Sequence, residues 1–166
     1  MNILTESLVE ETIQAVQEAG ACLSDPTALR CVRTKSKTDY VTNVDLAVQE
    51  FLRERLAALA PDVQFMGEEQ DNTGLDWSRP CWILDPVDGT TNLIHNFRHS
   101  AVSLALAEDG QTVFGVVYNP YSGECFTARR GQGAFCNGSP IRVSSADRLE
   151  DCLLYTSPSP RDYAAS

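Results

Sequence analysis

The stretch that decides the fold is Trp82–Asn92, which reads Trp-Ile-Leu-Asp-Pro-Val-Asp-Gly-Thr-Thr-Asn. Its apolar run, which ends abruptly at Asp85, predicts a buried β-strand with polar residues at its carboxyl end. Two carboxylates, a glycine, two hydroxyls and an amide then follow within eight positions. Asp85-Pro86 and Asp88-Gly89 are also common turn dipeptides, so a plain tight loop explains either of them alone. Because no turn needs the whole series, we expect polar chemistry at the end of this strand.

The composition is that of one globular domain. The chain has 166 residues, of which 43% are hydrophobic and 22% are charged, and this is enough for a single core. Its net charge of -10 argues against nucleic-acid binding and against an anionic membrane surface, because both need a basic footprint. The sequence has no recognisable signal peptide and no run of membrane-spanning length. We therefore expect a cytoplasmic protein without a membrane or nucleic-acid partner.

The six cysteines form no metal or redox motif. They stand at positions 22, 31, 81, 125, 136 and 152, without a Cys-x-x-Cys pair or a Cys/His cluster. Zinc and redox-active sites therefore have little support. Cys81 and Cys125 lie beside apolar residues, where a free cysteine behaves as a small core residue.

Two amphipathic helices are predicted before the central strand. In residues 5–23, apolar side chains recur at helical spacing until Pro26 follows. Thr42 stands three residues before Asp45, so a capping box accounts for both residues without any catalysis. The apolar face of the second helix is formed by Val44, Ala47, Val48, Phe51, Leu52, Leu56 and Leu59.

Short strands separated by turn signals make up most of the remaining sequence. A strand at 63–66 leads into Gly67-Glu68-Glu69, so a second strand also runs into carboxylates. Later segments alternate in polarity and are separated by turns at 108–110, 119–123 and 137–138, which predicts an antiparallel meander. We expect an α+β fold with two N-terminal helices packed on an antiparallel sheet.

The last residues differ in character from the rest. From Tyr155 onward the sequence has no periodicity, and Pro158 and Pro160 exclude a continuous regular element. We expect residues 1–154 to form the domain and residues 155–166 to be a disordered or non-native tail. The stretch from about Cys152 resembles translated library-adapter sequence.

The acids at the strand ends indicate a metal-assisted phosphate site. Glu68, Asp85, Asp88 and the Val87 carbonyl offer only oxygen ligands, which suit a hard cation such as Mg²⁺. Clustered carboxylates also need a cation to neutralise them. Downstream, residues 89–91 can open a short helical turn whose free amides bind phosphate. Metal ligands beside an anion cradle are typical of phosphoryl chemistry.

Two further patterns favour structural interpretations. Gly131 and Gly133 lack the third glycine and the following helix of a dinucleotide-binding loop, so hairpin glycines explain them better. His95 and His99 have no serine or cysteine nucleophile motif to serve, which favours surface or supporting roles.

Four ordered motifs resemble the inositol monophosphatase family of magnesium-dependent, lithium-sensitive phosphatases. They are residues 38–45, 67–69, 85–92 and 131–138, so the resemblance runs from the first helix to about Leu154. It implies the N-terminal part of a layered α-β-α-β-α sugar-phosphatase fold. It also implies a small phosphomonoester substrate and a homodimer for the full-length form.

The resemblance implies a role for each matched position. Glu68, Asp85 and the Val87 carbonyl would hold the first metal, and Asp85 and Asp88 would bridge to others. Glu68 and Asp88 thereby count among the catalytic residues.

The remaining matched residues would act on water and phosphate. Thr90 and Asp45 orient the attacking water, and the amides of Gly89, Thr90 and Thr91 bind phosphate together with the metals. The implied reaction is direct in-line attack of a metal-activated water on inositol monophosphate, without a covalent phosphoenzyme.

The family pattern continues into a second α/β region with a further Trp-Asp metal ligand, and nothing after Leu154 corresponds to it. We therefore expect an inactive fragment that binds Mg²⁺ weakly, binds phosphate poorly and exposes the surface that the missing part would cover.

Three alternatives stay open. A sugar or nucleotide bisphosphate phosphatase shares the metal motif, although Asn92–His95 looks more like the inositol branch. A haloacid-dehalogenase-type phosphatase has one residue between its two aspartates, whereas Pro86 and Val87 make two here. A non-catalytic interaction module is the third alternative.

Overall fold

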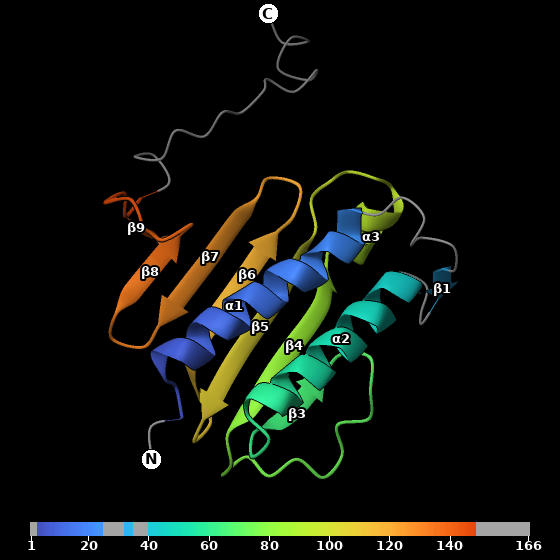
Figure 1. Cartoon of the computed structure of the whole chain (residues 1–166). Coiled ribbons are helices and arrows are strands. Elements are labelled where there is room, and N and C mark those ends of the chain that lie inside the picture. The colour runs from blue at the N-terminus through green and yellow to red at the C-terminus, as the bar shows by residue number, and fades with distance from the viewer. Residues whose placement is uncertain (1–2, 25–31, 35–39, 149–166) are drawn as a thin grey trace, which may run out of the picture.

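The computed structural model describes residues 3–24, 32–34 and 40–148. The tail 155–166, the motif residues Thr38 and Asp39, and Cys31 and Cys152 lie outside these ranges. In chain order the elements are α1 (Glu6–Gly20), the 3₁₀ turn η1 (Ala21–Ser24), β1 (Val32–Thr34), β2 (Tyr40–Thr42), α2 (Asn43–Leu59), β3 (Gln64–Gly67), β4 (Cys81–Asp88), α3 (Thr90–Ile94), β5 (Ala101–Glu108), β6 (Gln111–Asn119), β7 (Glu124–Arg129), β8 (Gly133–Cys136) and β9 (Ser139–Ile141) (Figure 1).

A seven-stranded sheet organises the described chain. Its strands follow the order β3-β4-β5-β6-β7-β8-β9, and β1 and β2 form a separate two-stranded sheet. From β4 to β9 every neighbouring pair is antiparallel, which confirms the predicted meander. β3 differs, because it lies at the edge of the sheet and pairs parallel with β4. The α+β class is confirmed, with a mixed sheet.

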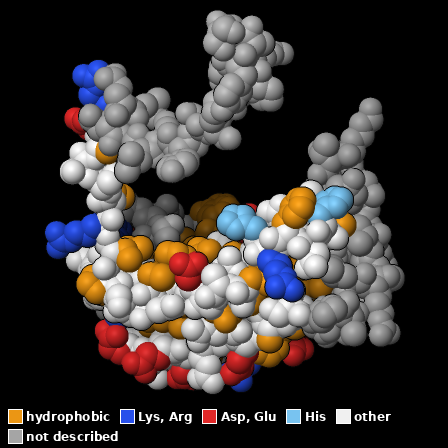
Figure 2. Space-filling view, turned by 90° about the horizontal axis from the view of Figure 1, so that it is seen from above, with side chains coloured by type: hydrophobic (Ala, Val, Ile, Leu, Met, Phe, Trp, Pro, Cys, Tyr) orange, Lys and Arg blue, Asp and Glu red, His pale blue; other side chains and the backbone are white. Residues whose placement is uncertain are grey.

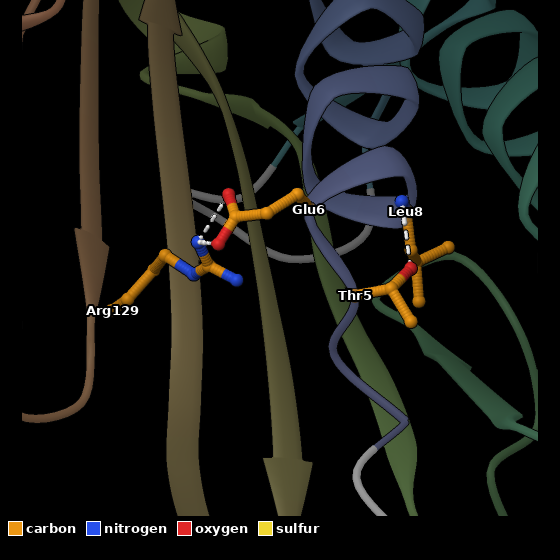
Figure 3. Close-up of polar contacts among 4 residues, drawn as sticks. All are labelled: Thr5, Glu6, Leu8 and Arg129. Atoms are coloured by element: carbon orange, nitrogen blue, oxygen red, sulfur yellow. Dashed lines mark hydrogen bonds and ion pairs between the residues drawn. The ribbon is translucent and has the colours of Figure 1, made fainter.

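Both long helices lie side by side on one face of the sheet (Figure 1). The side chain of Thr5 caps α1 by accepting a hydrogen bond from the Leu8 amide at 3.2 Å (Figure 3). Arg129 Nη1 on β7 lies 2.6 and 2.7 Å from the two carboxylate oxygens of Glu6 and so joins the start of α1 to the sheet (Figure 3). Within the described ranges, no helix is long and apolar enough to cross a membrane.

The core fills the layer between the helices and the sheet. Strand residues of alternating position supply one side, as expected for a sheet with one buried face. The predicted buried strand is confirmed, because Trp82 and Leu84 of β4 are both almost fully buried. The main contributors from the helices and the sheet are Leu8, Val16, Val48, Leu52, Leu56, Trp82, Leu84, Val102, Leu104, Leu106, Phe114 and Val116.

The buried face of α2 is more polar than its sequence pattern predicts. Ala47, expected on the apolar face, is exposed. Asp45 and Gln49 are buried instead, with 2% and 8% of their surface exposed. They lie four residues apart, on the helix face that also carries Val48, Leu52 and Leu56. Two polar side chains on a buried face need polar partners, and those partners belong to the candidate site.

The opposite face of the sheet carries small and apolar side chains. A groove of about 310 Å³ crosses β5 to β9, and Val117, Phe126 and Ile141 on its walls are partly exposed. Hydrophobic side chains lie along the upper side of the described part in Figure 2, while acidic side chains gather on the lower side. Glutamates on the outward faces of α1 and α2 account for this acidic side.

Two leucines of α2 allow the helix–sheet packing to be tested. Leu52→Ala should lower the free energy of unfolding by about 2–5 kcal/mol, because it leaves a cavity in the core. Leu46→Ala is the matched control and should cost about 1 kcal/mol or less. The wild-type side chains are 0% and 41% exposed, respectively. Urea denaturation followed by circular dichroism measures both, and equal losses would contradict the described orientation of α2.

Candidate active site

The site lies where β4 ends, and a β-bulge shapes that end. Asp85 pairs with Ser103 and Asp88 pairs with Ala101, so β4 uses one residue more than β5 between these pairs. In a regular strand, residues three apart point to opposite faces, and one extra residue removes an alternation. Pro86 suits this position because it has no amide to donate to the ladder. The bulge thereby lets both aspartates act on the same side of the strand.

Glu68 reaches Asp85 through the parallel pairing of β3 with β4. Gly67 is the register partner of Leu84, so Glu68, which follows β3, comes next to Asp85 of β4. Burial, the negative charges of Glu68 and Asp88, and a hydrogen bond to Glu68 raise the pKa of Asp85 to about 7. Two predicted ligands, Glu68 and Asp88, are thus close enough to Asp85, the third, for their charges to act on it.

Asp45 is held at the start of α2 and uses its two oxygens differently. Its Oδ2 accepts from the Thr42 amide at 2.8 Å and from the Thr42 hydroxyl at 2.5 Å, and the capping box is formed. Its Oδ1 lies 3.2 Å from Thr90 Oγ1. Thr90 Oγ1 also lies 3.0 Å from the Val87 carbonyl oxygen. The structural and the functional interpretations of Asp45 therefore coexist in one side chain.

The predicted helical turn after the aspartates is present as α3. Gly89 is its N-cap and has a φ of 92°, in the left-handed region that favours glycine. A side chain there would also be crowded, since a Cβ would come within 3.0 Å of the His99 carbonyl. Ser100 Oγ donates to the Gly89 carbonyl at 2.9 Å. Thr90 and Thr91 follow as the first helical residues, whose amides have no partners within the helix.

Side-chain amides hold the turn that carries Glu68. Asn72 Nδ2 donates to the Gly67 carbonyl at 2.7 Å, and Gln70 Nε2 donates to the Phe65 carbonyl at 3.1 Å. Gln49 of α2 accepts from the Glu69 amide at 2.9 Å through Oε1. Sequence reasoning missed these supports, because a glutamine or asparagine has no spacing that marks it as a partner of a distant turn.

The donor chemistry at this edge fits a divalent cation. Carboxylates of Glu68, Asp85 and Asp88 and the Val87 carbonyl supply only oxygen, and a carbonyl bonded to Thr90 keeps a second lone pair. Among the residues that the structure describes, no cationic side chain is one of the groups that shift the pKa of Asp85. Across the described ranges, however, no three histidine, cysteine or acidic side chains are grouped closely enough to hold an ion by themselves. A bound ion would therefore also need the carbonyl and water.

The other candidates are two histidines, two glycines and the cysteines. His95 and His99 are exposed in the α3–β5 loop. The ring of His95 stacks on that of Phe97, with 5.9 Å between the ring centroids. Gly131 and Gly133 lie at the β7–β8 turn, as hairpin glycines do. The four cysteines in the described ranges are free thiols.

Comparison with known proteins identifies relatives of this chain. Residues 4–163 match the model of the inositol monophosphatase family. An inositol monophosphatase of Dictyostelium discoideum is 35% identical over 164 residues, which cover 93% of this chain and 58% of that protein. The chain thus spans somewhat more than half the length of this relative.

Solved structures show the same likeness. The extragenic suppressor protein suhB of Bartonella henselae superposes with a TM-score of 0.82 at 39% identity, over 89% of this chain and 57% of that one. Inositol monophosphatase II of Staphylococcus aureus has been solved with inositol monophosphate and with 2'-AMP bound. In these two complexes it superposes with TM-scores of 0.71 and 0.73 at 26% and 27% identity, over 86% and 87% of this chain and 52% of that one. With its family model, its relatives and its fold in agreement, this chain belongs to the inositol monophosphatase family.

Proposed function

We propose that this chain carries the metal- and phosphate-binding part of a Mg²⁺-dependent phosphatase that hydrolyses inositol monophosphate. The observation that carries the proposal is the contact between Glu68 and Asp85, whose shared environment raises the pKa of Asp85 to about 7. Like charges are costly to hold together unless a cation joins them. The chain covers 58% of its Dictyostelium relative, so the activity is proposed for a protein of that relative's length.

Each part of the site has a proposed task. Glu68, Asp85, Asp88 and the Val87 carbonyl hold the cation. When bound, Mg²⁺ supplies charge stabilisation of the phosphoryl group and activation of the attacking water. The amides at the start of α3, at Gly89–Thr91, hold the phosphate oxygens.

Thr90 and Asp45 are proposed to orient the water. Thr90 Oγ1 lies 3.2 Å from Asp45 Oδ1 and 3.0 Å from the Val87 carbonyl oxygen. In the proposed reaction its single hydrogen points to Asp45, which leaves a lone pair to face the water. Asp45 then serves as the group toward which the proton moves. This arrangement needs no covalent phosphoenzyme, and a phosphoaspartate trapped at Asp85 would contradict it.

The substrate is proposed from the family, and one neighbour widens the choice. The Staphylococcus aureus enzyme was captured with 2'-AMP as well as inositol monophosphate. A ribose 2'-phosphate is therefore the second candidate substrate. The homodimeric form and the cytoplasmic location rest on the motif resemblance and belong to the same proposal.

The activity is tested with a chimera of residues 1–148 and the C-terminal remainder of the Dictyostelium relative. We expect Mg²⁺-dependent phosphate release from inositol 1-phosphate by the chimera, and little release by the 166-residue chain alone. A colorimetric phosphate assay with inositol 1-phosphate and 2'-AMP measures both. Equal turnover by the chain and the chimera would contradict the expectation that the chain alone is inactive. No turnover by a folded chimera would contradict the proposed reaction.

The cation site is tested directly by binding. Asp88→Asn should weaken Mg²⁺ binding by roughly tenfold or more, because such sites depend on the number of charged oxygen ligands. Asp71→Asn is the matched control, since Asp71 lies in the 68–80 loop and bonds Thr73 instead. Isothermal titration calorimetry on the purified chain gives the dissociation constants. Wild-type affinity in the Asp88 variant would remove that residue from the site.

The pH dependence of stability provides a further test. The pKa of Asp85 is raised from 3.8 to about 7 in the folded chain, so between these values the folded state binds more protons than the unfolded state. Without a divalent cation, the contribution of Asp85 to the free energy of unfolding is therefore greatest below about pH 4. This contribution is lost as the pH rises through about 7. Saturating Mg²⁺ should remove this loss.

Urea midpoints from pH 5 to 8, in EDTA and in Mg²⁺, measure the effect. Asp85→Asn should flatten the EDTA profile, whereas Asp71→Asn should leave its slope unchanged. An unchanged slope in the Asp85 variant would show that another group titrates.

A further inference from the structure

We infer that Gln49 is a positioning residue that fixes the Glu68 carboxylate relative to the Asp45–Thr90 pair. The inference deepens the proposed function and rests on it. Gln49 is only 8% exposed, and its Oε1 accepts from the Glu69 amide at 2.9 Å. It therefore bonds the residue directly after the predicted metal ligand.

Gly67, directly before Glu68, lies against the side chain of Gln49. Its φ is not among the positive values of the described chain, so backbone conformation does not explain a glycine here. A Cβ at this position would instead lie on Gln49 Oε1 and within 2.6 Å of its Cδ. The amide of Gln49 thus lies directly against Gly67, and a side chain there would have to displace it.

The position of β3 makes this support important. β3 is the edge strand of the sheet, so β4 alone pairs with it there. Asn72 and Gln70 belong to the same loop as Glu68. Gln49 supports this loop from a different element, α2.

α2 links the two halves of the site. Asp45 and Gln49 are one turn apart on the same buried face, and a helix holds such residues about 6 Å apart along its axis. Asp45 faces Thr90, and Gln49 holds the Glu68 turn. A rigid helix therefore sets the spacing between the water-orienting pair and the first metal ligand.

The test compares two variants that keep the length of the side chain. Gln49→Met keeps the packing on Gly67 but loses the acceptor, while Gln49→Glu keeps an acceptor for the Glu69 amide. We expect Gln49→Met to lose exchange protection of that amide and to weaken Mg²⁺ binding about tenfold, as loss of an outer-shell partner does. Gln49→Glu should keep both within about threefold. Amide exchange by NMR and calorimetry with Mg²⁺ alone measure these two properties.

A double-mutant cycle with Gly67→Ala gives the sharper test. If the alanine acts by displacing Gln49, it should reproduce the Gln49→Met effect, and combining the two should add little. Additive losses, or a Gln49→Met variant with unchanged Glu69 protection and Mg²⁺ affinity, would overturn the inference. So would a Gln49→Glu variant as impaired as Gln49→Met. Urea denaturation of each variant ensures that the comparison is made between folded chains.

Failure of the proposed function would look different. If the wild-type chain does not bind Mg²⁺, the metal site itself is wrong, whatever the Gln49 variants do. If the wild type binds Mg²⁺ and Gln49→Met binds it equally well, the metal site stands and the positioning role is wrong.

Discussion

The burial of Asp85 beside two other carboxylates is the constraint on which this site depends. Burial and the negative charges of Glu68 and Asp88 raise the pKa of Asp85, so the fold holds this carboxyl group in an unfavourable environment. It does so with backbone features: the register that pairs Gly67 with Leu84, and the bulge between Asp85 and Asp88. A ladder of backbone hydrogen bonds is well suited to this, because its energy is shared over the whole sheet rather than concentrated at the site.

The supports nearest the acids are neutral amides. Gln49, Gln70 and Asn72 hold the Glu68 turn through hydrogen bonds to the main chain. A lysine or arginine in their place would lower the pKa of the carboxylates and relieve the repulsion. It would also compete with any cation for the same oxygens. These neutral supports fix the geometry of the turn without adding charge to it.

Much of this arrangement could be predicted from local sequence. The apolar run of β4, the amphipathic faces of the two helices and the turn residues each depend on residues a few positions apart. Their patterns can therefore be recognised in the sequence. The parallel partnership of β3, the bulge at Pro86 and the role of Gln49 depend on residues brought together from distant segments. A glutamine on a helix is ordinarily solvent-exposed, and only the packing on Gly67 distinguishes this one.

Asp45 shows why a structural explanation of a motif does not exclude a functional one. A carboxylate has two oxygens and about four lone pairs. At Asp45, Oδ2 is used by Thr42 to cap α2, while Oδ1 faces Thr90. The cap also fixes the rotamer, so the oxygen that faces Thr90 is held in place by the same bonds that begin the helix. The capping box therefore also fixes the oxygen that faces Thr90, as the proposed water-orienting role of Asp45 requires.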